Sequence, residues 1–272
     1  MPELQILVAT MHQRDLRLAE EMNIRCDAII ANQSDTSSFL TEETAHGSLT
    51  MITTPTRGVG LNRNIALLAA DAEILLFADD DITYYDGTAE AVKAAFRDLP
   101  DADAIIFSTD LSKGGEIYEK RHLPIKRRHV WNALKFGTYA LAVRRKAVLR
   151  TNISFNQLFG GGCLYGSGEE SLFILDCLRR GLKIYTHSHV LGVCRKDSSS
   201  WFTGFGEKYF FDKGAFFAFA FPKMKWAVSL FFAVRMCLRK KTQLSLPKML
   251  RMMRLGRRAA KELRGYKDVC HD

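Results

Sequence analysis

Three consecutive aspartates, Asp79, Asp80 and Asp81, form the strongest chemical signal in this 272-residue chain. They directly follow an apolar run, Ile74–Ala78, which is typical of a buried strand. In an open parallel sheet, ligands bind outside the carboxyl ends of strands, and adjacent carboxylates there repel one another unless a cation or hydrogen-bond donors offset their charge. Oxygen ligands of this kind suit Mg²⁺ or Mn²⁺ together with phosphate oxygens. The alternative is an acidic turn in which Asp81 caps a helix.

A second segment, Arg-Gly-Val-Gly-Leu-Asn-Arg-Asn at 57–64, precedes an expected helix and could hold a phosphate group. Its glycines leave backbone N–H groups open at the helix N-terminus, and Arg57 and Arg63 add positive charge. The segment lacks the Gly-Lys-Ser/Thr ending of a Walker loop, and it does not follow the first strand as a dinucleotide-binding fingerprint would. A plain turn with a helix cap explains the segment equally well.

A pair of glutamates opens another expected helix. Glu169 and Glu170 follow Gly168 and a glycine-rich loop, a position that suits a general base presented at the rim of a pocket. Acidic residues in a first turn also complement the helix dipole, which is the simpler alternative. His187 and His189 lie two residues apart beside an expected strand, so one of them could be a metal ligand or each could be a solvated strand-end histidine.

Short apolar runs alternate with helical patterns in the elements that must position these residues. The expected strands are Leu4–Ala9, Ala28–Ala31, Leu49–Thr53, Ile74–Ala78, Ala104–Phe107, Thr138–Val143 and Leu182–Tyr185. The expected helices are Leu16–Met22, Asn62–Ala70, Thr88–Leu99 and Glu169–Arg180, with Thr88 as an N-cap, Pro100 as a stop and Gly114-Gly115 as a hairpin turn. Strands that are apolar throughout and are separated by helices predict a doubly wound, mostly parallel α/β sheet covered on both faces.

Composition restricts the class of protein. With 47% hydrophobic and 25% charged residues, the chain is neither disordered nor fibrous nor of low complexity. Its six cysteines form no CxxC pair, which favours reduced thiols over a zinc site or a disulfide framework. We expect no signal peptide and no transmembrane helix, because the most apolar stretch, Gly214–Val234, is interrupted by Pro222, Lys223 and Lys225.

The net charge of +9 is concentrated near one end of the chain. From Lys223 to Asp272 there are 14 Lys and Arg residues against three acidic ones, which predicts an anionic partner for this tail. We expect the tail, residues 201–272, to dock on an anionic membrane surface, or alternatively to pack its aromatic residues against the rest of the protein. The aromatic and apolar residues on which this expectation rests are Trp201, Phe202, Phe205, Tyr209, Phe210, Phe211, Phe216, Phe217, Phe219, Phe221, Trp226, Leu230, Phe231 and Phe232, followed by a basic helix over Lys248–Arg264 that also carries Met249, Met252, Met253 and Leu255.

Taken in order, these motifs resemble those of the family 2 glycosyltransferases of the GT-A fold, as found in bacterial surface-polysaccharide assembly. The matching landmarks extend from Leu4 to Val193. They are the first strand ending in Val8-Ala9-Thr10, the second ending in Asn32-Gln33-Ser34-Asp35, the Gly-Leu-Asn-Arg-Asn helix start, the aspartate triplet, the Phe155–Gly160 segment and the Gly-Glu-Glu helix start. The resemblance implies a catalytic domain over 1–200, with a nucleotide-sugar half at 1–110 and an acceptor half at 111–200.

The same resemblance implies roles for single residues. Thr10, Asn32 and Arg57 would line the nucleotide base pocket, and Asn62 and Arg63 would support the diphosphate. Asp79 and Asp80 would bind the donor, while Asp81 would hold Mn²⁺ or Mg²⁺. His189, from its position beside a strand rather than from the resemblance, is the candidate second ligand. Glu170 stands where the family has its catalytic aspartate, with Glu169 beside it. Two departures from the family pattern are Asn32-Gln33, which replace the acidic residue that reads uracil, and glutamate in place of the catalytic aspartate.

The function that follows is inverting, metal-dependent transfer of a sugar, as a hexosyltransferase, from a nucleoside-diphosphate sugar to a hydroxyl of a glycan or lipid-linked oligosaccharide. We expect the enzyme in the cytoplasm, on the inner face of the cell membrane, and with no nucleic-acid partner. A sugar-nucleotide nucleotidyltransferase is the nearest alternative, but it needs a basic glycine-rich loop after the first strand, where this chain has Thr10–Gln13. A nucleic-acid-binding protein would explain the basic tail and leave the aspartate triplet unexplained.

Overall fold

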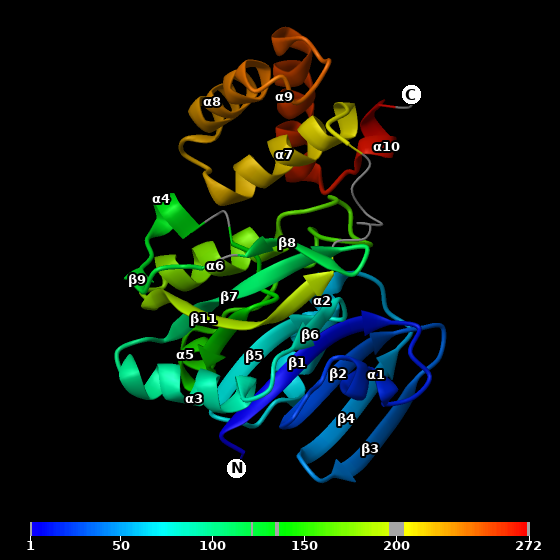
Figure 1. Cartoon of the computed structure of the whole chain (residues 1–272). Coiled ribbons are helices and arrows are strands. Elements are labelled where there is room, and N and C mark those ends of the chain that lie inside the picture. Colours follow the sequence, from blue (N-terminus) through cyan, green and yellow to red (C-terminus); the bar gives the residue numbers. More distant parts are fainter. Residues whose placement is uncertain (1, 121, 134–135, 196–203, 271–272) are drawn as a thin grey trace.

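One large mixed sheet forms the centre of the protein (Figure 1), in a computed structural model that describes residues 2–120, 122–133, 136–195 and 204–270. Its eleven strands include a nine-strand path in the order β3-β4-β2-β1-β5-β10-β7-β11-β6, with β8 paired to β7 and β9 to β11. The strands are β1 Leu4–Met11, β2 Asp27–Gln33, β3 Ser38–Thr44, β4 Gly47–Thr54, β5 Ile74–Asp79, β6 Ile82–Tyr84, β7 Ala104–Lys113, β8 Glu116–Lys120, β9 Lys126–Arg127, β10 Leu141–Arg144 and β11 Ile184–Arg195. The helices are α1 Arg17–Glu21, α2 Val59–Ala69, α3 Thr88–Asp98, α4 Val130–Ala133, α5 Arg145–Thr151, α6 Glu169–Arg179, α7 Glu207–Ala220, α8 Lys225–Leu238, α9 Leu246–Glu262 and α10 Tyr266–Cys270.

Parallel pairing dominates the half of the sheet that carries the aspartates. Strands β4, β2, β1 and β5 are parallel neighbours, and the register places Ala9 beside both Ala31 and Asp79. β10 runs antiparallel between β5 and β7, so β5 and β7 point the same way. The carboxyl ends of β1, β2, β5 and β7 therefore meet at one edge, where an α/β sheet binds its ligands.

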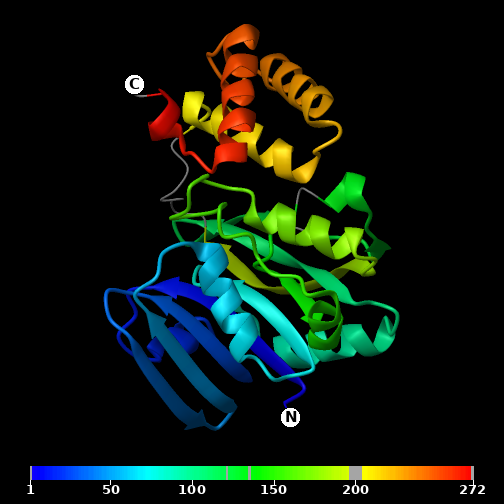
Figure 2. The same ribbon diagram turned by 180° about the vertical axis from the view of Figure 1, so that it is seen from behind.

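Helices cover both faces of the sheet, as Figure 2 shows from behind, so the predicted doubly wound α/β fold is confirmed. On one face, Leu18 of α1, Met22 just after that helix and Phe96 of α3 pack against alternate strand residues. On the other face, Leu67 of α2 and Phe173 of α6 pack against the intervening strand residues. This division follows from the two-residue period of strands, which sends neighbouring side chains to opposite faces.

The structure corrects several local predictions. Asp81 is followed by strand β6, so the interpretation of Asp81 as a helix cap is wrong. Thr88 is the first residue of α3 rather than its N-cap, and its hydroxyl donates to the Leu191 carbonyl at 2.7 Å. Helix α2 begins at Val59, three residues before the predicted start. Strands β3, β6, β8 and β9 were not predicted, because they are short or carry mainly exposed polar residues.

The C-terminal helices α7 to α10 form a third core with the loop before α6. Phe210 and Phe211 of α7 are fully buried and pack with Phe159 and Tyr165. α7 and α9 cross closely at Gly256, where an added Cβ would collide with the Phe211 carbonyl of α7. Within the described ranges, no helix combines the length and the apolar character needed to cross a bilayer.

The predicted division at residue 200 stays a prediction, because residues 196–203 lie outside the described ones and the tail shares its core with the preceding loop. Trp201 and Phe202, which belonged to the predicted membrane-docking set, lie outside the described residues too.

Candidate active site

Arg63 of α2 joins the two acidic motifs that the sequence left 90 residues apart. Its Nη2 lies 2.6 Å from Oδ1 of Asp79 and 3.5 Å from Oε1 of Glu170, and its Nη1 lies 3.2 Å from Oε1 of Glu169. The Arg63 side chain is only 3% exposed. One buried guanidinium therefore holds the end of β5 against the start of α6, at the carboxyl edge of the sheet.

The charges around Arg63 are unbalanced, because three carboxylates face one cation. Burial alone lowers the pKa of Arg63, but the charges of Asp79, Glu170 and Glu169 more than compensate and leave that pKa raised. The guanidinium also lies over the Phe155 ring, 5.4 Å from its centroid. The net negative charge that remains suits a ligand or a cofactor that brings positive charge.

Glu170 is the glutamate with access to solvent. Its Oε1 accepts hydrogen bonds from the backbone N–H of Thr138 at 2.7 Å and from the Thr138 hydroxyl at 3.0 Å, and its side chain is 30% exposed. Burial is the largest effect on the pKa of Glu170 and raises it. The charges of Asp79 and Glu169 raise it further, against the opposing effects of Arg63 and Thr138. A carboxylate whose pKa is raised toward neutrality is suited to take up a proton during a reaction.

Glu169 is more enclosed and has a structural role. Its Oε2 accepts the backbone N–H of Gly168 at 3.1 Å, and Oε1 is the atom that contacts Arg63. Only 10% of the Glu169 side chain is exposed. Glu169 therefore stabilises the start of α6, as the capping interpretation expects, while the general-base interpretation of Glu170 stays a prediction.

Asp80 connects the triplet to the end of β1. The Thr10 hydroxyl donates to Oδ2 of Asp80 at 2.6 Å, and Nε2 of Gln13 donates to the Thr10 hydroxyl at 3.1 Å. Burial raises the pKa of Asp80, and the hydrogen bond from Thr10 opposes that rise. The structure thus brings together Thr10, Asp79 and Asp80, as the donor-site prediction requires.

Asp81 lies beside the end of β11. The Sγ of Cys194 lies 3.3 Å from Oδ1 of Asp81, and the N–H of Arg195 donates to the Asp81 carbonyl at 2.8 Å. His189, the predicted second metal ligand, is on the same strand, five residues before Cys194, and its N–H donates to Nδ1 of His187. Among the described residues, no group of three or more His, Cys, Asp or Glu side chains is arranged around a common point.

These donors nevertheless fit a magnesium-like cation. Mg²⁺ and Mn²⁺ are commonly held by one or two protein carboxylates, with phosphate oxygens and water as the other ligands. Asp80 and Asp81 supply carboxylates at the strand end, where a diphosphate would lie if the donor binds at this edge.

Two predicted donor-site asparagines support the site from behind. Asn32 is 0% exposed, and its amide bonds both the N–H and the carbonyl of Gln13, each at 2.9 Å. Nδ2 of Asn62 donates to the carbonyls of Thr10 and Ala31 at 3.0 and 2.8 Å. Asn32 holds the loop after β1, and Asn62 joins the ends of β1 and β2. The Asn32 side chain is buried and bonded to Gln13, so it does not reach a nucleotide base directly.

The start of α2 is also occupied by internal hydrogen bonds. The N–H of Gly58 donates to Oε1 of Gln33 at 2.9 Å, and the N–H of Val59 donates to the Gly161 carbonyl at 3.1 Å. These two amides are therefore not open to phosphate, contrary to the phosphate-cradle interpretation. Arg57 remains at the surface, where it contacts Asp35 and the Ser34 carbonyl.

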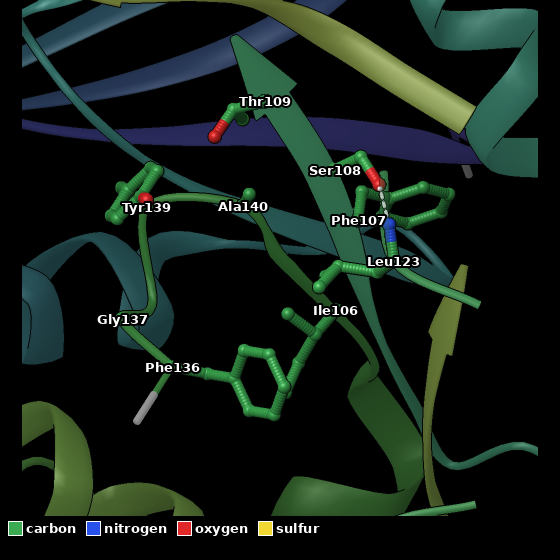
Figure 3. Close-up of a pocket in the computed structure, with 9 residues that line it drawn as sticks. All are labelled: Ile106, Phe107, Ser108, Thr109, Leu123, Phe136, Gly137, Tyr139 and Ala140. Atoms are coloured by element: carbon green, nitrogen blue, oxygen red, sulfur yellow. Dashed lines mark hydrogen bonds between the residues drawn. The ribbon is translucent and has the colours of Figure 1, made fainter. Parts of the chain in front are cut away.

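Two cavities adjoin Glu170. The first, of about 320 Å³, lies between β7 and the segment before β10 (Figure 3), with Phe136, Gly137 and Tyr139 along one side and Ser108 and Leu123 along the other. A Cβ added to Gly137 would lie 3.2 Å from Oε1 of Glu170, which places this wall beside the carboxylate.

The second cavity, of about 330 Å³, is lined by the glycine-rich loop, by both glutamates and by Lys213 of α7. Nζ of Lys213 lies 3.4 Å from the Ser167 hydroxyl. Burial lowers the pKa of Lys213, although the charges of Asp212 and Glu169 oppose this. Sequence reasoning missed Lys213, Thr138 and Cys194, since each is brought to the site by contacts between elements far apart in the chain.

Comparison with known proteins bears on the family and the fold of the chain. A sequence profile of glycosyl transferase family 2 matches residues 24–159, which is half of the chain. No curated protein matches the chain significantly.

Solved structures share its fold. The S. aureus TarS fragment 1–349 in complex with UDP-GlcNAc superposes with a TM-score of 0.60 at 14% identity, over 97% of this chain and 93% of that one. The same fragment in complex with UDP gives a TM-score of 0.58 at 14% identity, with the same coverage. A longer TarS structure gives 0.61 at 15% identity, over 93% of this chain and 55% of that one. At this level of identity the likeness establishes the GT-A fold alone. Taken with the profile over half of the sequence, it means that the chain belongs to glycosyl transferase family 2 and is a glycosyltransferase.

Proposed function

We propose that this glycosyltransferase moves a sugar from a nucleoside-diphosphate sugar to an acceptor hydroxyl with inversion at the anomeric carbon. The observation that carries the proposal is the contact of one buried arginine, Arg63, with Asp79 at the end of β5 and with Glu170 at the start of α6. A transferase of this type needs donor-binding carboxylates and a base within reach of the same sugar. Arg63 fixes these two groups relative to each other.

Glu170 is the proposed base. In the reaction the Glu170 carboxylate takes the proton of the acceptor hydroxyl, and the hydroxyl oxygen forms a bond to the anomeric carbon. The bond from that carbon to the diphosphate oxygen breaks on the opposite face, and its electron pair leaves with the diphosphate. The raised pKa of Glu170 and its position between two cavities support this role over Glu169, which is bonded to the helix start. The transition state has oxocarbenium character, as in other glycosyl transfers.

Asp81, assisted by Asp80, is the proposed ligand of Mn²⁺ or Mg²⁺. Such an ion would offset the negative charge that develops on the leaving diphosphate. His189 stays a candidate further ligand, and the Cys194 side chain also lies beside Asp81.

The donor pocket is proposed to lie over the ends of β1, β2 and β5. Thr10 fixes Asp80, and Asn32 fixes the loop after β1. Asn62 joins the ends of β1 and β2, and Arg57 lies at the rim beside Asp35. Since the TarS structures of the same fold contain UDP-GlcNAc or UDP, uridine diphosphate sugars are the first donors to test.

The cavity with Lys213 is the proposed acceptor side. A half-buried cation that lines the same cavity as the base suits an acceptor with a phosphate or another anionic group, such as a lipid-linked oligosaccharide of surface-polysaccharide assembly. Such an acceptor is assembled at the inner face of a cell membrane, so we propose a cytoplasmic enzyme associated with that face.

Release of nucleoside diphosphate is the test. The protein is incubated with a panel of nucleotide sugars and Mn²⁺, and the released nucleotide is identified. The proposal predicts release of a nucleoside diphosphate from one donor class, together with a donor-dependent rise in thermal stability. Formation of a nucleoside triphosphate with added pyrophosphate would instead identify a nucleotidyltransferase.

A further inference from the structure

Helix α8 has apolar residues on two opposite faces, and only one of these faces is covered. Ser229, Ala233 and Met236 are buried against the rest of the helical tail. The other face, which we call the open face of α8, carries large apolar side chains with exposures between 37% and 79%: Trp226, Leu230, Phe231, Val234 and Leu238. A helix that is apolar all round is normally enclosed on all sides, so the open face calls for a covering partner.

The sequence around α8 is strongly basic. Between Lys213 and Lys261 the chain has 13 Lys and Arg residues and no Asp or Glu. Cations stand at both ends of the open face, with Lys223 and Lys225 before it and Arg239, Lys240 and Lys241 after it. Along α9, Arg251, Arg254, Arg258 and Lys261 are exposed as well. Apolar side chains bordered by cations, without acidic residues, match the boundary between lipid headgroups and acyl chains.

Trp226 is held in place before any partner binds. Cζ of Arg257 lies 3.8 Å from the centroid of the Trp226 ring, and Nη1 of Arg257 donates to the Ser229 hydroxyl at 2.6 Å. Arg257 itself is only 5% exposed. The ring is therefore supported from beneath, and 58% of Trp226 remains exposed.

From this arrangement we infer that the open face of α8 binds the surface of an anionic lipid bilayer, with the helix lying in the plane of the headgroups. The structure narrows the docking surface that the sequence suggested, because Phe210, Phe211, Phe216 and Phe217 of α7 and Met249 and Met253 of α9 are buried in the protein. Those residues pack inside the protein, so for the α7 aromatics the alternative expectation, packing against the rest of the protein, is the one that the structure supports.

Two other partners fit less well. In a symmetric dimer each copy presents the same patch. Pairing two open faces would therefore bring together two cationic surfaces that lack acidic residues, and repulsion between their like charges would weaken the dimer. A nucleic acid would match the cations but would leave Phe231 and Leu238 against a polar phosphate backbone. An anionic bilayer accommodates both the cations and the apolar side chains.

The test is flotation of the full chain with vesicles of phosphatidylcholine alone or with an equal part of phosphatidylglycerol. We expect binding to the anionic vesicles at low salt and partial release at high salt. The double change Leu230→Ser and Phe231→Ser should lower the partition constant at least about tenfold, because both side chains lose apolar contact. Neutralising Arg239, Lys240 and Lys241 to Gln should lower it by about fivefold for each cation at low salt.

A matched control is available at the other end of the molecule. Phe39 and Leu40 of β3 are 67% and 40% exposed, and β3 lies far from α8 (Figure 1). The double change Phe39→Ser and Leu40→Ser should leave the partition constant within about twofold, since it removes similar apolar area from a surface without the cationic border.

The inference fails if the α8 double variant floats as well as the unchanged protein. It also fails if that variant changes only the molecular mass measured by light scattering, because this would identify a dimer interface. A third contrary result is binding of the protein to duplex DNA without binding to either kind of vesicle. Release of nucleoside diphosphate in the absence of vesicles should be equal in all variants. That readout separates failure of membrane docking from failure of the proposed transferase activity.

Discussion

Replacing Arg63 with methionine removes the buried cation that contacts both acidic motifs, while keeping an apolar stem against Phe155. Breaking a buried ion pair by removing one partner usually lowers the free energy of unfolding by about 3–5 kcal/mol. The side chains of Asp79 and Glu170 are 32% and 30% exposed, so water can partly solvate their carboxylates after the change. The Glu169 side chain is only 10% exposed, so its carboxylate would be the one least solvated once Arg63 is removed. We therefore expect Arg63→Met to lower the free energy of unfolding by about 3 kcal/mol near pH 8.

The pH dependence of this loss identifies its cause. Arg63 lowers the pKa of Glu170, so without Arg63 that pKa, already raised by burial, rises further. A carboxyl group whose pKa is raised in the folded state stabilises the fold at low pH, and this stabilisation is lost as the pH rises through the folded-state pKa. The deficit of Arg63→Met should therefore be largest at pH 8 and shrink toward pH 5.

Urea unfolding of the unchanged protein, Arg63→Met and Arg57→Met at both pH values measures these quantities. Arg57 is the matched control because it also pairs with an aspartate, but on the surface, with Arg57 at 51% and Asp35 at 83% exposure. We expect that control to change the free energy of unfolding by less than about 1 kcal/mol. An equal deficit for Arg63→Met at pH 5 and pH 8, or one no larger than that of Arg57→Met, would refute the role given to the arginine.

Three further predictions concern the metal site, the base and the tail. Asp81→Ala should abolish transfer and the Mn²⁺-dependent part of the thermal stabilisation by uridine diphosphate. Full activity in that variant would show that Asp81 is not a required metal ligand. Thr138→Val removes a hydroxyl donor from Glu170, so the pKa of Glu170 should rise. Since the base is active only above its pKa, the acid limb of the pH–rate profile should then move to higher pH. An unchanged acid limb would show that Glu170 is not the group whose ionisation produces that limb. Gly256→Ala should lower the free energy of unfolding by about 1–3 kcal/mol in urea, because the new Cβ meets the Phe211 carbonyl. Gly206→Ala, where no atom lies within 4 Å of the added Cβ, should have little effect, and equal losses in the two variants would contradict the close crossing of α7 and α9.

Much of the fold could be predicted because its central strands are buried on both faces. Runs such as Ile74–Ala78 are apolar at every position, and each corresponds to a strand of the sheet. Strand β3 escaped prediction because its seven residues are mostly exposed and polar, so only its pairing with β4 makes it a strand. β10 was predicted as a strand, but its antiparallel direction depends on which strands it meets, and that is set by the whole chain.

The candidate site could be predicted as a set of residues but not as an arrangement. The triplet, the glycine-arginine segment and the glutamate pair stood out by residue type and by their position after strands or before helices. Arg63 was assigned to a diphosphate, whereas in the structure it pairs with carboxylates, one of which lies 106 positions along the chain. Such a contact results from packing between α2 and α6, and neither local pattern contains it.

The tail shows the same limit in another form. Aromatic residues are dense in both α7 and α8, so the sequence could not separate those that pack inside from those that face outward. In the structure Phe211 is fully buried, while Phe231 is 68% exposed. Only the placement of α7 between α9 and the loop before α6 distinguishes the two.

The most direct test of the account compares donor binding and turnover in Glu170→Gln and Glu169→Gln. Binding of the donor sugar nucleotide is measured at equilibrium with Mn²⁺, and turnover is measured as release of nucleoside diphosphate. We predict that Glu170→Gln binds the donor as well as the unchanged enzyme does but turns over at least about 100-fold more slowly, which is typical for loss of a general base. If Glu169→Gln is the more severe change, the base is the neighbouring residue. Undiminished turnover in both variants would contradict the claim that this pair carries the reaction.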